Sequence, residues 1–114
     1  MTTRDDLRRL GDLAALKAAR DRAALAAVEA RAAPIRAALA RLDAPPPEAA
    51  PDDLREARDR AAWSAWAGTE RRRLQMDLAR LRAELDGAKR LAAKATAREA
   101  VIGKLRDTAP PRRR

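Results

Sequence analysis

The chain has 114 residues, of which 38% are charged, and this length is enough for at most one domain. Basic residues outnumber acidic ones by 26 to 17, and the net charge of +9 favours contact with nucleic acid, acidic lipid or an acidic protein surface. Because Cys and His are absent, disulfides, thiol redox chemistry and the usual zinc sites are excluded. Alanine supplies more than half of the hydrophobic residues, and Phe and Tyr are missing. This composition favours two helices packed along one seam over a compact core.

The first predicted helix covers about residues 3–42. Thr3 and Asp6 form a capping pattern at its start, with acids in the first turn. A heptad seam follows at the spacing 3-4-3-4-3, through Leu25, Val28, Ala32, Ile35, Leu39 and Leu42. Continued backward, the seam reaches Asp21, Ala18, Ala14, Gly11 and Leu7, where Leu10, Leu13 and Leu16 indicate a drift of register. Pro34 lies inside the seam and is expected to kink the helix without ending it, because the heptad phase continues beyond it.

A proline-rich loop at residues 43–51 is predicted to separate this helix from a second one at about residues 52–107. The second helix opens with a capping-box-like pattern from Asp53 to Glu56. Its seam is clearest at Leu74, Leu78, Leu81, Leu85, Ala88, Ala92 and Ala95, and it returns at Ile102. Residues 109–114 are expected to form a flexible, disordered basic tail.

Folding the chain back at about residue 47 pairs the two seams, with Val28 near Trp66 and Leu10 near Leu85. The second helix is longer, so its last sixteen or so residues would project, over about 24 Å at 1.5 Å per residue. The predicted fold is therefore all-α. It is an elongated two-helix antiparallel coiled-coil hairpin in one domain, with an overhanging second helix.

The overhang is the predicted partner-binding element, since Val101, Ile102 and Leu105 would have no partner in the first helix. Positive charge beside these apolar residues favours an acidic partner. That charge comes from Lys94, Arg98, Lys104 and Arg106, and from the tail residues Arg112, Arg113 and Arg114.

Two further groups have two interpretations each. Trp63 and Trp66, the only aromatic residues, either fill space opposite the small residues of the first helix or anchor a partner, as Trp often does. The first interpretation is favoured. Arg71, Arg72 and Arg73 point in directions about 100° apart, which favours a solvated face over a contact to phosphate or an acidic protein.

Enzymatic chemistry has little support in the sequence. Ser64 is the only serine and has no neighbouring base, no Gly-rich phosphate loop occurs, and neither a cofactor nor a metal is expected. No apolar run approaches the ~20 residues that span a bilayer, and charges near the start argue against a signal peptide. A cytoplasmic location without membrane insertion is therefore predicted. The split heptads argue against a DNA-binding zipper, and nonspecific nucleic-acid binding stays an alternative.

The layout of the second helix resembles the small coiled-coil stalk proteins of flagellar and type III secretion export, the FliJ/YscO-like group. The residues that carry the resemblance are Arg60, Trp63, Trp66, the run Arg71-Arg72-Arg73-Leu74, the leucines at 78, 81 and 85, and the Lys/Arg/Ala pattern from Lys89 to Arg98. The chain is shorter and richer in alanine than usual members.

The resemblance implies a coiled coil similar to the rotor stalk of a rotary ATPase. It would insert into a hexameric export ATPase, promote ATPase assembly and activity, and link the ATPase to the export gate and to chaperones. A different class also fits the residues: a generic helical-hairpin scaffold that self-associates or binds nucleic acid.

Overall fold

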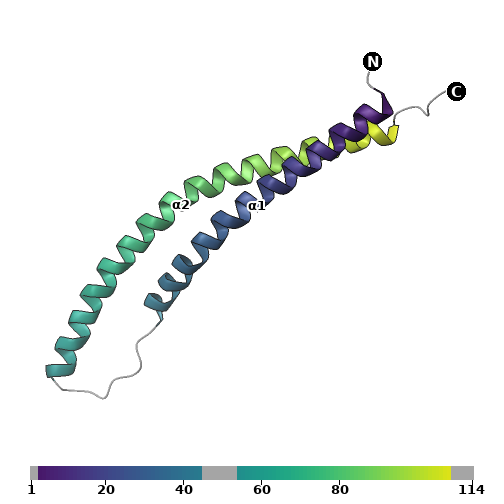
Figure 1. Cartoon of the computed structure of the whole chain (residues 1–114). Helices are drawn as coiled ribbons and strands as arrows, with labels where there is room; N and C mark the ends of the chain where they lie inside the picture. The colour runs from purple at the N-terminus through teal and green to yellow at the C-terminus, as the bar shows by residue number, and fades with distance from the viewer. Residues whose placement is uncertain (1–2, 45–53, 109–114) are drawn as a thin grey trace. The chain divides into compact units, whose positions relative to one another are not determined.

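The computed structural model describes residues 3–44 and 54–108, and all regular secondary structure in these ranges is helical. Helix α1 covers Arg4–Asp43 and helix α2 covers Leu54–Thr108 (Figure 1). The predicted all-α fold is confirmed, and both helices have bounds within about two residues of those predicted. Residues 45–51 of the loop expected at 43–51, the expected capping residue Asp53 and the tail expected at 109–114 lie outside the described residues.

The start of α1 has the capping box expected from its sequence. The Thr3 side-chain oxygen accepts a hydrogen bond of 3.1 Å from the Asp6 backbone N–H, and Asp6 Oδ2 accepts one of 3.2 Å from the Thr3 N–H. The hydrogen bond from the Thr3 N–H holds the pKa of the Asp6 carboxyl below its ordinary value. Further along, α1 continues through Pro34 as one helix.

Burial confirms the predicted heptad seam on each helix. On α2 the least exposed side chains, at 3–8%, are those of Ala67, Leu74, Leu78, Leu81, Leu85, Ala92 and Ala95. On α1, Ala18 and Ala32 are fully buried, and seam residues such as Leu25, Val28 and Leu39 are half-buried. The expected drift of register near the start of α1 is wrong, because Leu10, Leu13 and Leu16 are 46%, 62% and 69% exposed. Regular 3-4 spacing through Gly11 and Ala14 leaves these leucines outside the seam.

The chain divides into two compact units, each built from a part of both helices. Unit 1 contains residues 3–29 of α1 with residues 84–108 of α2. A Cβ atom placed on Gly11 would lie 3.8 Å from Ile102 Cγ2 and 3.8 Å from Arg106 Nη1. Further along, Arg22 Nη1 donates to Thr96 Oγ1 at 3.2 Å and lies 3.7 Å from Glu99 Oε2. The two segments of unit 1 are therefore antiparallel, with the start of α1 beside the end of α2.

This pairing corrects the predicted register. The fold-back at residue 47 placed Leu10 near Leu85, whereas its neighbour Gly11 lies beside Ile102, about 18 residues (roughly two and a half heptads of seven residues) further along α2 than predicted. The expectation that the last turns of α2 lack a partner in the chain is therefore wrong. The physical reason is that seams rich in alanine offer several registers in which apolar residues meet apolar residues.

Unit 2 contains residues 30–44 of α1 with residues 54–83 of α2. Arg71 fixes its register, because Arg71 Nε and Nη2 lie 3.2 and 3.1 Å from Asp43 Oδ1, and Nη2 donates to the Leu42 carbonyl at 3.3 Å. Carbonyls in the last turn of a helix have no partner within the helix, so this arginine satisfies one of them. The end of α1 thus lies beside residue 71 of α2.

The most exposed part of α2 is consequently its beginning. Every residue from 54 to 66, here called the leading segment, is exposed. This segment forms the teal start of α2 in Figure 1. The first buried residue of α2 is Ala67, one turn before Arg71. The surplus length that the sequence predicts in the second helix exists, but it lies at the opposite end of that helix.

Candidate binding surfaces

An apolar hollow of about 200 Å³ lies between α1 and α2 in unit 1. Two of its residues are leucines just outside the α1 seam, and most of the others come from one side of α2. We call it the leucine hollow, and it is lined by Leu10, Leu13, Ala14, Lys17, Ala95, Arg98 and Ile102. Because Leu10 and Leu13 stay largely exposed, the helix pair leaves an apolar surface uncovered here.

The charges at this hollow are predominantly positive. Lys17 Nζ lies 3.3 Å from Asp21 Oδ2, so an acid on the same helix partly balances this cation. Arg98 is exposed, and Lys94 is exposed one turn before it on α2. Leu91 and Leu105 stand seven residues on either side of Arg98, on the same side of the helix, and are 56% and 52% exposed. The surface therefore combines exposed leucines with a basic rim.

The structure places the predicted overhang residues in different environments. Lys94, Arg98 and Lys104 are exposed cations on α2. The apolar side chains of Val101, at 56%, and Leu105 are exposed as well. Ile102 is half-buried against the start of α1, so it contributes to the seam as well as to the hollow.

Arg106 belongs to a second, polar hollow of about 510 Å³ that also includes Arg4, Asp5, Arg8 and Asp107. Its guanidinium Nε lies 3.8 Å from Asp107 Oδ1, which is an exposed pair of little energetic weight. The tail residues Arg112, Arg113 and Arg114 lie outside the described residues.

Sequence reasoning missed Leu10 and Leu13 as surface residues. Both were assigned to a drifting seam opposite Leu85 and Leu81, although the uninterrupted spacing Leu7, Gly11, Ala14 predicts that neighbouring positions flank the seam. The available signal was a leucine at such a flanking position, as Leu13 is, one helical turn before a lysine.

Trp63 and Trp66 both lie in the leading segment and are 45% and 55% exposed. The favoured interpretation, that they fill space against the first helix, is therefore wrong. Asp59 precedes Trp63 by four residues and Glu70 follows Trp66 by four, so the spacing 4-3-4 places all four residues on one side of α2. We call this group the tryptophan face. It presents two exposed indoles between two acidic residues.

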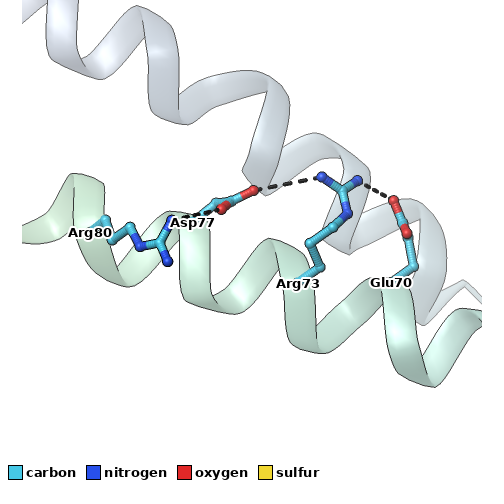
Figure 2. Close-up of polar contacts among 4 residues, drawn as sticks. All are labelled: Glu70, Arg73, Asp77 and Arg80. Atoms are coloured by element: carbon cyan, nitrogen blue, oxygen red, sulfur yellow. Dashed lines mark hydrogen bonds and ion pairs between the residues drawn. The ribbon is translucent and has the colours of Figure 1, made fainter.

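The three arginines of the triplet are engaged in separate contacts within unit 2. Arg71 bonds the end of α1, and Arg72 Nη2 lies 3.5 Å from Thr69 Oγ1. Arg73 contacts Glu70 and lies 3.7 Å from Asp77 Oδ2, and Arg80 lies 3.9 Å from Asp77 Oδ1 (Figure 2). The hydrogen bond between Arg73 and Glu70 lowers the pKa of Glu70 and raises that of Arg73. Arg72 and Arg73 are exposed, as the solvated-face interpretation expects, whereas Arg71 is half-buried and joins the two helices, which neither interpretation predicted.

Across residues 3–44 and 54–108, no group of three or more Asp and Glu side chains could hold a metal ion. In the same ranges neither helix has a stretch apolar enough to cross a bilayer. The two surfaces with recognisable chemistry are thus the leucine hollow and the tryptophan face, and both are suited to binding.

Comparisons of this chain with protein-family models, with curated proteins and with solved structures found no match.

Proposed function

We propose that this chain is a non-enzymatic coiled-coil stalk or adaptor of a flagellar or type III protein-export ATPase, and that it promotes assembly or activity of that ATPase. The observation that carries the proposal is the basic, leucine-rich side of unit 1, on an antiparallel helix pair of the kind that the sequence resemblance implies. An export gate and export chaperones are further partners in the same proposal.

The chemistry of this surface favours an acidic protein partner. Exposed leucines supply apolar area, which is worth about 25 cal/mol per Å² when it is removed from water. Lys94 and Arg98 supply charge that guides association with an acidic ring and selects against basic partners. Arg98 also borders the hollow, so its charge would lie close to any side chain that enters it.

Charge reversal tests the proposal more sharply than truncation does. Deleting the end of α2 would remove Ile102, which packs against the start of α1, and would therefore disturb unit 1 itself. The double variant K94E/R98E leaves the seam residues unchanged. The matched control is Lys89→Glu, an exposed charge reversal on the other side of the same helix.

The measurement is the rate of ATP hydrolysis by a hexameric export ATPase as each chain is added, at two salt concentrations. The unaltered chain and the Lys89→Glu control should stimulate hydrolysis, and the double variant should lose most of that effect. Stimulation by the unaltered chain should also require more protein at the higher salt concentration, because salt screens exposed charges. Equal stimulation by the double variant, or none by the unaltered chain, would reject this function and leave the generic scaffold.

A further inference from the structure

We propose that two copies of this chain associate head to tail, with the tryptophan face of one copy seated in the leucine hollow of the other. This inference concerns the chain by itself and does not require an export ATPase. It assigns a partner to the two exposed surfaces that neither helix covers within the chain.

The tryptophan face has the features of a binding anchor. Trp63 and Trp66 expose about half of each side chain on a helix segment in which every residue is exposed. Buried Trp side chains dominate the energetics of many interfaces because they bring a large apolar area with few rotatable bonds. Burial of these indoles by a partner would remove the largest exposed apolar groups of the leading segment from water.

The leucine hollow has the matching chemistry. It is apolar inside, it is bordered by exposed Leu10 and Leu13, and its charged lining residues are the cations Lys17 and Arg98. On the opposing surface Asp59 and Glu70 flank the indoles. Glu70 is bonded to Arg73 and Lys17 lies beside Asp21, so the charge complementarity rests mainly on Asp59 and Arg98. Arg98 can in addition lie over an indole ring, where a cation is attracted by the negative face of the ring.

The same charges argue against two symmetric alternatives. Two tryptophan faces brought together would place acidic residues against acidic residues, and two hollows would place cations against cations. Contact between two unlike surfaces is heterologous, and such a contact leaves one free surface at each end of a pair. Assembly should therefore continue beyond a dimer as concentration rises, unless the geometry closes a ring.

The test is sedimentation of the full chain over a range of concentrations, starting from a monomer of 12.5 kDa. The unaltered chain should increase in mass with concentration, and its tryptophan emission should shift to the blue as the indoles leave water. The double variant W63A/W66A should associate at least about 30-fold more weakly, which is the effect of losing a strong interface anchor. Arg98→Glu should weaken association in the same way.

A mixing experiment distinguishes the proposal from other modes of association. W63A/W66A keeps an intact hollow and Arg98→Glu keeps an intact tryptophan face, so an equimolar mixture should form a one-to-one complex that grows no further. Met76→Ala is the control, since Met76 is 60% exposed on α2 and lies ten residues beyond Trp66, outside the tryptophan face, and it should assemble as the unaltered chain does.

Circular dichroism of each variant is the folding control. It should show that the helices are retained, because the substituted side chains are exposed. A chain that stays monomeric at all concentrations would overturn the proposal. Tryptophan variants that assemble normally, or a mixture that fails to form the one-to-one complex, would overturn it equally.

Discussion

Individual charged residues on this chain form many contacts but contribute little to stability. The network of Glu70, Arg73, Asp77 and Arg80 lies on the surface of α2, with side chains 26–76% exposed. Exposed ion pairs are typically worth 0–1 kcal/mol, because water screens them and ordering long side chains has an entropic cost. Stability at the residue scale must come mainly from the few larger side chains in the seams.

Leu81 gives the clearest test that the larger seam side chains supply most of the stability, since it is 6% exposed in the centre of the α2 seam. Leu81→Ala should lower the free energy of unfolding by about 2–4 kcal/mol, the usual range for truncating a buried leucine. Leu91→Ala is the matched control, because Leu91 is 56% exposed on the same helix and its truncation should change stability by less than about 0.5 kcal/mol. Chemical denaturation followed by circular dichroism measures both. Similar losses for the two variants would mean that the seam is misplaced.

At the scale of the helices, the leading segment should be the least protected part of α2. Residues 54–66 are all exposed, and a helix of this length gains little stability from its own hydrogen bonds in water. In dilute solution their backbone amides should exchange with deuterium at least about 10-fold faster than those of the buried stretch around Leu78 and Leu81. Hydrogen exchange with mass spectrometry measures this. Equal protection of both stretches in the monomer would contradict the expectation, whereas protection that appears only at high concentration is the result expected for head-to-tail association.

The helices and their seams could be predicted from sequence, whereas their pairing could not. Periodicity is local, so the spacing of Leu74, Leu78 and Leu81 predicts which side of the helix is buried without reference to a partner. The register depends on long-range matching, and repeated alanines make several matches nearly equivalent. Arg71 resolves it in the structure by bonding Asp43 and the Leu42 carbonyl, a contact between residues 28 and 29 positions apart.

This difficulty extended to the candidate binding surfaces. A register error of about 18 residues (roughly two and a half heptads) moved the exposed segment from the predicted end of α2 to the other end. Lys94 and Arg98 are exposed although the overhang on which they were placed does not exist, and Trp63 and Trp66 were assigned to the wrong environment. Residues on the surface of unit 1 were recognised by their charge, which does not depend on the register.

At the scale of the whole molecule, the net charge of +9 must be weighed against its distribution. Many of the cations lie close to acids, as Lys17 does to Asp21 and Arg71 to Asp43. The three arginines of the basic triplet make three separate contacts, which argues against a single phosphate-binding cluster. The charge distribution therefore favours weak, general attraction to polyanions over a defined nucleic-acid site.

We therefore expect the chain to bind duplex DNA only weakly at physiological salt, with a dissociation constant above about 1 µM, as is typical of nonspecific binding. Binding should strengthen steeply as salt is lowered, because it would rest on the release of counterions from phosphates, and it should not depend on base sequence. Fluorescence anisotropy with two labelled duplexes of different sequence, at several salt concentrations, measures both properties. The variant R72E/R73E should weaken binding only modestly, since these arginines are already engaged with Thr69 and Glu70. Nanomolar affinity at physiological salt, with a large loss in this variant, would instead identify the triplet as a nucleic-acid site and favour that function over the export-ATPase adaptor.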